Sequence, residues 1–204
     1  NTFDTNDYEY NRKSIKSPYQ EFKYYLNLGY TVDDFFILAP SCKKNKKLSP
    51  ILKLANKLTD EGINIYVSEN DSVKLDNDII KNKVVFSTFH QVKGLERKVV
   101  MIFNFDESYF RYYAKDKNPY KCPNELYVAP TRCLEKLTLF HHNENNYLPF
   151  INKKYIEENC FFIKNNLNIK ENKDDKKNKD VSVTDFIRFT NETVMNNIVE
   201  KFIN

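Results

Sequence analysis

Five residues that could bind phosphate, sugar or base follow a single short apolar run in this chain. They are Thr88, His90, Lys93, Gly94 and Glu96, and they come after Val84-Val85-Phe86. A hydroxyl and an imidazole can contact a phosphate and a base or sugar, a glycine lets a backbone approach closely, and a carboxylate can accept hydrogen bonds from a ribose. The pattern predicts a site that contacts nucleic acid and nucleotide together.

The apolar run indicates where this site lies. In an open α/β sheet, ligands bind outside the carboxyl ends of the strands, because side chains escape the packed core there. If Val84 to Thr88 is a buried strand, the whole stretch from Ser87 to Glu96 is expected at its carboxyl end.

The elements that would hold the site alternate between strands and helices. Short continuous apolar runs predict strands buried on both faces of a sheet, and apolar residues at helical spacing predict the helices between them. Expected strands cover residues 35–39, 63–67, 84–88, 99–104 and 137–140, and expected helices cover 17–28, 48–62 and 125–133. Ser17-Pro18 would cap the first helix and Gly29 would end it. Residues 1 to about 150 are therefore expected to form one α/β domain with a central, mainly parallel sheet.

The chain changes character after Phe150. Residues 164–180 are almost wholly Lys, Asn, Asp and Glu, so we expect a polar linker over residues 151–180. An amphipathic pattern then resumes, which predicts a helical element, or the start of a further domain, over residues 181–204.

Composition excludes several classes of protein. No window approaches the roughly 18 apolar residues of a membrane-spanning helix, and no signal-peptide pattern opens the chain. The four cysteines form no C-x-x-C pair, which favours a reducing compartment such as cytoplasm or nucleus. A zinc site from Cys122, Cys133, His141 and His142 can be drawn, but metal modules use tighter spacing, so no metal site is expected. The net charge of +4 is weak evidence for nucleic-acid binding.

Two stretches resemble a known family when they are taken in order. Thr88 to Glu96, T-x-H-x-x-K-G-x-E before a buried strand, resembles motif V of superfamily 1 helicases of the UvrD/Rep type. Glu125 to Arg132, ELYVAPTR with a strand after it, resembles motif VI of the same helicases. A looser similarity at Phe35 to Ser41 extends the resemblance to roughly residues 17–142. The resemblance implies the second RecA-like domain of a P-loop NTPase motor.

The resemblance also implies a role for each site residue. Arg132 would reach the γ-phosphate of ATP, where a planar, permanently charged fork suits phosphate oxygens. Glu96 and Gly94 would contact the ATP, with Glu96 on the ribose. Thr88, His90 and Lys93 would contact single-stranded or duplex nucleic acid. Movement from 3′ to 5′ on DNA is the activity that this branch of the family implies.

Two positions depart from the family pattern. Pro130 falls inside the expected motif VI helix, where it removes a backbone donor and should kink the helix before Arg132. Cys133 stands where the family usually has Ala.

The phosphate loop G-x-x-x-x-G-K-[ST] is missing from the 204 residues, and the chain does not start with Met. We therefore expect a piece of a longer polypeptide, in which an upstream RecA-like domain holds most of the ATP and Mg²⁺. Alone, the piece should not hydrolyse ATP. The competing hypothesis is a helicase-derived module that binds nucleic acid or a partner and has lost hydrolysis.

Three of the site residues also have a structural alternative. Arg132 could be a solvated salt-bridge partner, His90 a structural histidine, and Glu96 a surface ion pair with Arg97 or Lys98. An aromatic cluster could stack on bases or fill the core, and the core is favoured. Its members are Phe103, Phe105, Tyr109, Phe110, Tyr112 and Tyr113. A lysine group could follow a phosphate backbone or be a solvated helix start. Its members are Lys43, Lys44, Lys46 and Lys47.

Overall fold

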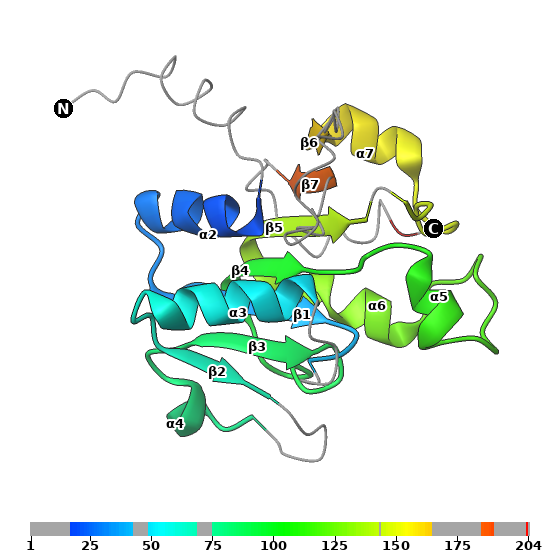
Figure 1. The fold of residues 1–204 in the computed structure, drawn as a ribbon. Helices are drawn as coiled ribbons and strands as arrows, with labels where there is room; N and C mark the ends of the chain where they lie inside the picture. The colour runs from blue at the N-terminus through cyan, green and yellow to red at the C-terminus, as the bar shows by residue number, and fades with distance from the viewer. Residues whose placement is uncertain are drawn as a thin grey trace, which may run out of the picture.

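The computed structural model describes residues 17–42, 49–68, 75–142, 144–164, 185–189 and 203. Within these ranges the chain forms one sheet with helices on both faces (Figure 1). The strands are β1 (Phe35–Ala39), β2 (Ile65–Val67), β3 (Val84–Thr88), β4 (Arg97–Ile102), β5 (Cys133–His141), β6 (Cys160–Lys164) and β7 (Asp185–Phe189). Their order across the sheet is β2-β3-β1-β4-β5-β7-β6. Strands β1 to β5 run parallel, which confirms the predicted α/β fold with a mainly parallel sheet.

The helices lie mostly in the segments between the parallel strands. They are α2 (Pro18–Asn27), α3 (Pro50–Asp60), α4 (Asn77–Ile80), α5 (Ser108–Tyr112), α6 (Asn124–Val128) and α7 (Lys153–Asn159), with 3₁₀ turns η1 (Val32–Asp34) and η2 (Pro130–Arg132). The ends of α2 follow the sequence signals: the backbone N–H of Gln20 donates to the Ser17 hydroxyl at 3.2 Å, and Gly29 leaves the helix at a φ of +95°. These two features confirm the predicted cap and stop.

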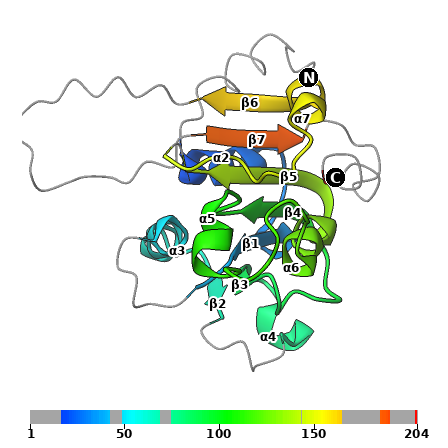
Figure 2. The same cartoon turned by 90° about the vertical axis from the view of Figure 1, so that its right-hand side faces the viewer.

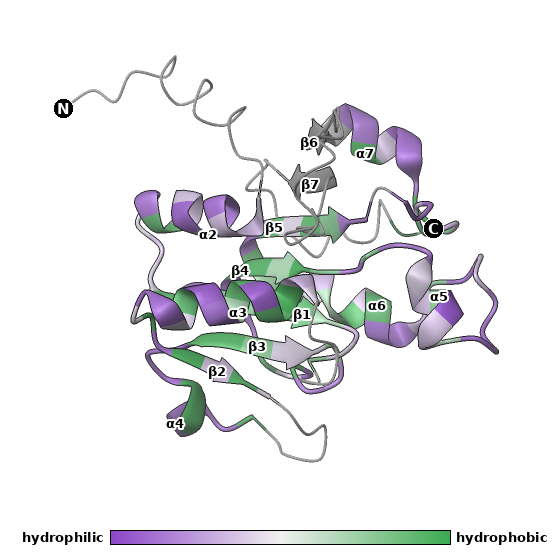
Figure 3. Ribbon diagram, in the orientation of Figure 1, coloured by the Kyte–Doolittle hydropathy of each residue, from purple (hydrophilic) through white to green (hydrophobic). Residues whose placement is uncertain are grey.

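One face of the sheet is covered by α2 and α3. Phe22 and Tyr25 of α2 and Leu54 of α3 pack against strand residues such as Phe86 in one buried cluster. Every residue of β1 and β3 is buried, as continuous apolar strands require when both faces are covered. Figure 3 shows the result, with apolar strands inside and polar outer surfaces on the helices.

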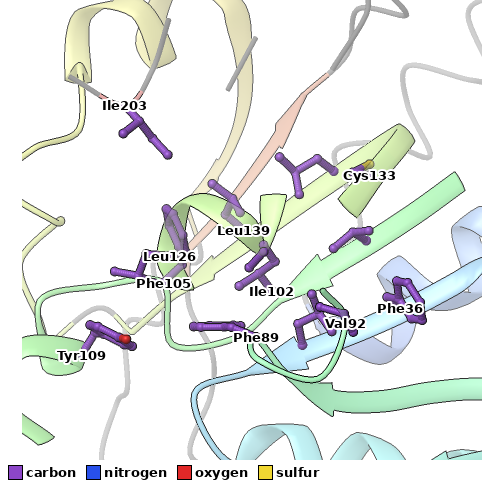
Figure 4. Close-up of a cluster of buried hydrophobic side chains, with 14 of the residues drawn as sticks. Phe36, Phe89, Val92, Ile102, Phe105, Tyr109, Leu126, Cys133, Leu139 and Ile203 are labelled. Atoms are coloured by element: carbon purple, nitrogen blue, oxygen red, sulfur yellow. The ribbon is translucent and has the colours of Figure 1, made fainter. Parts of the chain in front are cut away.

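The opposite face is covered by short elements and a loop. Phe89 and Val92 of the β3–β4 loop, together with Leu126 of α6, pack on Phe36 and Leu139 of the strands (Figure 4). The stretch that carries the predicted site is thus also part of the hydrophobic core, through Phe89 and Val92.

The region after residue 150 differs from the prediction. The expected linker 151–180 contains α7 and β6, and the expected helical element 181–204 contains strand β7. Strand β7 runs antiparallel to β5 and β6. Without β7, β5 would present unpaired backbone N–H and C=O groups. Pairing with these groups stabilises an extended segment more than its apolar spacing alone stabilises a helix. Residues 165–184, with most of the polar run, lie outside the described residues.

Within the described ranges, no helix has the length and apolar character needed to cross a membrane.

Candidate nucleotide and nucleic-acid site

The loop between β3 and β4 runs from one side of the sheet to the other. It begins where the parallel strands end, here called the carboxyl edge, and finishes where they begin, here called the amino edge. Thr88 ends β3 and pairs with Ala39 at the carboxyl end of β1. The next parallel strand begins at Arg97, so residues 89–96 return along the face of the sheet and bring Glu96 to the amino edge. A strand as long as β3 separates the two edges by roughly 15 Å. The prediction that Ser87 to Glu96 all lie at the carboxyl end was wrong, because a parallel neighbour must start at the other edge.

At the carboxyl edge, the hydroxyls of Ser87 and Thr88 donate to the same side chain oxygen, Oε1 of Gln91, at 3.0 and 3.5 Å. The side chain of Thr88 is only 6% exposed. His90, two residues later, is exposed. Of the two residues expected to contact the strand at this edge, His90 is the one that faces solvent.

The middle of the loop is a turn pinned to the core. Val92 is fully buried, and its carbonyl accepts a hydrogen bond from the N–H of Leu95 at 3.0 Å. Gly94 has a φ of +85°, which favours glycine at this position. No heavy atom lies within 4 Å of where its Cβ would be, so space does not require the glycine. Lys93 and Gly94 lie on the outer side of this turn, and Lys93 is exposed.

At the amino edge, Glu96 and Arg132 lie next to each other. Arg97 of β4 pairs with Cys133 of β5, and the two site residues immediately precede this pair. Glu96 is exposed and Arg132 is half-buried. The register of β4 and β5 therefore brings to one edge two of the three residues that the sequence assigned to ATP, whereas Gly94, the third, lies in the middle of the loop.

Arg132 is held against its own turn. Its Nε donates to the carbonyl of Val128 at 3.3 Å, and its Nη2 donates to the Thr131 hydroxyl at 3.1 Å. Helix α6 ends at Val128 and continues as the 3₁₀ turn that starts with Pro130. The predicted interruption by Pro130 is confirmed. Among the described residues, Arg132 makes no ion pair, so the salt-bridge alternative has no support there.

Arg97 anchors the amino edge, and sequence reasoning missed it. Its Nη1 donates to the carbonyls of Val32, Phe35 and Lys83 at 3.3, 3.3 and 2.8 Å, and its Nη2 to that of Ile80 at 3.0 Å. The side chain is 8% exposed, and burial lowers the pKa of its guanidinium while nearby acidic groups raise it. From the sequence, Arg97 was considered only as a surface partner for Glu96. Its single signal was a charge directly before an apolar strand.

Lys98 pairs with Asp34 at 3.5 Å rather than with Glu96. With Arg97 directed at backbone carbonyls and at Asp33, 3.9 Å away, neither predicted partner binds Glu96 within the described part of the chain. The surface ion pair expected as an alternative for Glu96 is therefore not formed there.

His90 lies close to helix α6. Burial raises the pKa of Glu125, but a backbone hydrogen bond, the Lys117 ammonium at 3.0 Å and the charge of His90 lower it, and the net pKa is below its usual value. His90 and α6 lie on the same side of the molecule, because β3 points toward α6 (Figure 1) and His90 follows its last residue, Thr88.

The aromatic cluster divides into two groups. Phe103, Phe105 and Tyr109 are buried and Phe110 is half-buried against the core, as the core interpretation predicted. Tyr112 and Tyr113 are exposed, so that interpretation fails for them. The lysine group at residues 43–47 lies outside the described residues.

The cysteines Cys42, Cys122, Cys133 and Cys160 are free thiols. Cys133 is buried beside the amino edge, where its thiol donates to the Lys98 carbonyl at 3.6 Å and burial raises its pKa to about 12. In the parts of the chain that the structure describes, no three His, Cys, Asp or Glu residues are placed to hold a metal ion.

A comparison with known families decides the relationship. The model of the UvrD-like helicase C-terminal domain matches residues 9–144, which is more than half of the 204-residue chain. The chain belongs to this family. The match includes both motif stretches and every parallel strand, whereas β6 and β7 of this UvrD-like domain lie beyond it. Searches of curated proteins and of solved structures found no match.

Proposed function

We propose that this UvrD-like domain is the second wall of an ATP-dependent motor that moves from 3′ to 5′ on DNA. Arg132 reaches the γ-phosphate, Glu96 binds the ribose, and Gly94 lets the backbone approach the nucleotide. His90 and Lys93 contact the DNA strand, and Thr88 joins them if its hydroxyl leaves Gln91. An upstream RecA-like domain of the same polypeptide supplies the phosphate loop and holds most of the ATP.

The observation that supports this proposal is the shared position of Glu96 and Arg132. They come from different motifs, yet the pairing of Arg97 with Cys133 brings them to one edge of the sheet. One acceptor for sugar hydroxyls and one fork for phosphate oxygens, side by side, match two parts of one nucleotide. The strand contact at His90 lies at the other edge, so the two ligands need not compete for space.

The chemistry expected of Arg132 is electrostatic. Charge accumulates on the equatorial oxygens of the γ-phosphoryl group as it is transferred, and a guanidinium placed there stabilises the transition state more than the ground state. Its effect grows when closure of two domains excludes water. The hydrogen bonds to Val128 and Thr131 use two of the five N–H donors of Arg132, and breaking them would let the whole planar fork turn toward a phosphate. Domain closure would drive this change.

Mg²⁺ supplies charge neutralisation of the β- and γ-phosphates when it is bound. The described residues offer no acidic group of three for it. We therefore assign the Mg²⁺ ligands to the upstream domain, and to this chain only the contacts with ribose and γ-phosphate.

One observation favours a second candidate, a binding module that has lost hydrolysis. Pro130 ends α6 early and leaves Arg132 bonded within its own turn. If that turn is rigid, the guanidinium cannot reach a nucleotide, and the chain would retain only its nucleic-acid contacts.

Steady-state hydrolysis separates the two candidates. Residues 1–204 alone should hydrolyse no ATP, because they offer one wall of the cleft. The parent polypeptide, with its upstream region present, should hydrolyse ATP and do so faster with single-stranded DNA. Robust turnover by the isolated chain would contradict the two-domain motor. An upstream region that carries no phosphate loop and a parent protein with no turnover would establish the binding module instead.

A further inference from the structure

Exposed aromatic side chains gather in one short part of the chain. Among the described residues, the large hydrophobic side chains that are exposed are Ile79, Tyr112, Tyr113, Tyr120, Tyr127 and Leu134. All the aromatic ones fall within residues 112–127. Tyr112 and Tyr120 are the most exposed, at 61% and 74%. The fully buried aromatic rings elsewhere show that this chain can cover such groups, so their exposure here needs a reason.

These tyrosines lie on the same side of the sheet as His90, the proposed DNA contact at the carboxyl edge. Strands β3, β4 and β5 point toward the side of the molecule where α5 and α6 lie (Figure 1), and α5 and α6 face the viewer when the molecule is turned to that side (Figure 2). His90 follows Thr88, the last residue of β3, and so lies at the end of a strand that points to this side. The exposed tyrosines therefore continue the surface on which His90 lies.

Two sets of contacts hold α5 and the segment after it in place. The buried carboxylate of Asp106 accepts hydrogen bonds from the backbone N–H of Ser108, from the N–H of His142 and from the side chain amide of Asn145, at 3.0, 3.1 and 3.0 Å. Lys117 of the connecting segment pairs with Glu125 of α6 at 3.0 Å. The Asp106 contacts fix the start of α5, and the Lys117 pair ties the segment between α5 and α6 to α6.

Basic side chains alternate with the rings. Residues 107–127 contain Arg111, Lys115, Lys117 and Lys121 against Glu107, Asp116 and Glu125. Glu107 is paired with Arg111 at 3.1 Å and Glu125 with Lys117. Lys115 and Lys121 are exposed and make no ion pair among the described residues. Lysine is depleted at protein interfaces but suits a phosphate backbone, so this composition favours a nucleic acid over a protein as the occupant.

We propose that Tyr112, Tyr113, Tyr120 and Tyr127, named here the tyrosine platform, stack on bases of single-stranded DNA while Lys115 and Lys121 contact its phosphates. The inference rests on the proposed function, which brings a DNA strand to His90. Tyrosine rings offer flat apolar surface at little cost in side chain entropy, and they accept any base because every base has a π face. The platform lengthens the strand path of this domain from His90 across α5 and α6.

Fluorescence anisotropy tests the platform on the 204-residue chain. A labelled oligodeoxythymidylate is titrated at several salt concentrations with wild type, with Tyr112→Ala/Tyr120→Ala, and with Ile79→Ala/Leu134→Ala as a control that removes exposed apolar side chains elsewhere. The tyrosine variant should bind about 10-fold more weakly or worse, with an unchanged slope of log K against log salt, because stacking releases no counterions. The control should bind like wild type. Tyr112→Phe/Tyr120→Phe should retain affinity.

Lysine substitutions should act differently. Lys115→Ala/Lys121→Ala should weaken binding and make the salt slope shallower by roughly 0.7 for each phosphate that the lysines no longer neutralise. A slope unchanged by the lysine variant would remove the phosphate part of the proposal.

Two results would overturn the platform. If Tyr112→Ala/Tyr120→Ala binds like wild type while His90→Ala binds more weakly, the platform is wrong and the proposed function stands. If the wild-type chain binds no oligonucleotide, both the platform and the DNA contacts of this domain are wrong, and a protein becomes the occupant to seek. Tighter binding of an oligoribonucleotide of equal length would replace DNA by RNA as the occupant.

Discussion

The two edges of the parallel sheet differ in how they present their polar groups. At the amino edge, Glu96 and Arg132 directly precede two paired strands. The buried Arg97 beside them donates hydrogen bonds to four backbone carbonyls. At the carboxyl edge, His90 and the tyrosine platform lie on a loop, on two short helices and on the segment between them. Phosphoryl transfer needs fixed geometry, whereas sequence-independent binding of single-stranded DNA needs an extended exposed surface. The contrast agrees with the proposed division of the two ligands between the two edges.

One loop joins the two edges. Residues 89–96 begin at His90's end of the sheet and finish at Glu96, with Phe89 and Val92 buried between them. A displacement of either end must therefore move or strain a segment packed into the core. The loop is the shortest covalent route between His90, the proposed DNA contact, and Glu96, the proposed nucleotide contact.

The largest effect is expected at Arg132. In the parent polypeptide, Arg132→Ala should lower turnover by roughly 10³-fold or more and leave single-strand binding nearly intact, because an arginine finger acts on the transition state. Arg132→Lys should rescue little, since an ammonium lacks the bidentate fork. Steady-state ATPase and a binding titration at fixed salt measure both. Lys154→Ala, which removes an exposed basic side chain of α7 paired with Glu158, is the control. Equal turnover in Arg132→Ala and wild type would remove Arg132 from catalysis.

A large loss of stability is expected at Arg97. Arg97→Met removes the donor to the carbonyls of four residues at the amino edge and should cost about 3 kcal/mol or more of unfolding free energy. Lys98→Met, at the next position, removes only an exposed pair with Asp34 and should cost under about 1 kcal/mol. Urea denaturation of the 204-residue chain compares them. Equal losses would mean that Arg97 does not anchor this edge.

Alkaline pH should weaken the amino edge through Cys133. Burial raises the pKa of its thiol from 9.0 to about 12, so the unfolded chain ionises first as pH rises. The contribution is intact below pH 9 and is lost between pH 9 and about 12, at about 1.4 kcal/mol per pH unit. Cys133→Ala should make the decline of stability above pH 9 shallower by that amount. If wild type and Cys133→Ala lose stability equally with rising pH above pH 9, folding does not raise the pKa of the Cys133 thiol.

At the carboxyl edge, His90→Ala should weaken single-strand binding by about 10-fold. It should lower DNA-stimulated hydrolysis by the parent protein more than basal hydrolysis, because Glu96 and Arg132, the proposed nucleotide contacts, lie at the other edge. Lys81→Ala removes an exposed basic side chain just after α4 and serves as the control. A drop in basal hydrolysis equal to the drop in stimulated hydrolysis would show that the two edges do not act separately.

The smallest effect is expected at the turn of the connecting loop. Gly94→Ala should cost about 1 kcal/mol of stability, because its φ of +85° is unfavourable for alanine while nothing crowds the new methyl group. Gly62→Ala, at a φ of +75° after α3, should cost about the same. Only Gly94→Ala should also lower DNA-stimulated hydrolysis. Identical hydrolysis by the two variants would leave Gly94 with a structural role alone.

Much of the fold was predictable because strong local signals agreed with tertiary packing. Ser17 and Gly29 bounded α2, and the run Phe35 to Ala39 matched β1. Strand β7 was missed because its pairing with β5 is a long-range contact that no local spacing records. The position of Glu96 was missed for the same reason, since the edge it occupies depends on β4 running parallel to the strand that precedes it in the chain. The anchoring role of Arg97 and the exposure of Tyr112 depend on how the chain packs, and residue type alone does not reveal that packing.

A single loop is proposed to serve DNA at one edge of the sheet and a nucleotide at the other. The most direct test is a titration of the ¹⁵N-labelled 204-residue chain with oligodeoxythymidylate, followed by amide chemical shifts. We expect changes at His90, at Tyr112 and at Tyr120, with the amides of Glu96 and Arg132 nearly still. Changes centred on Glu96 and Arg132, with His90 unmoved, would contradict the proposal.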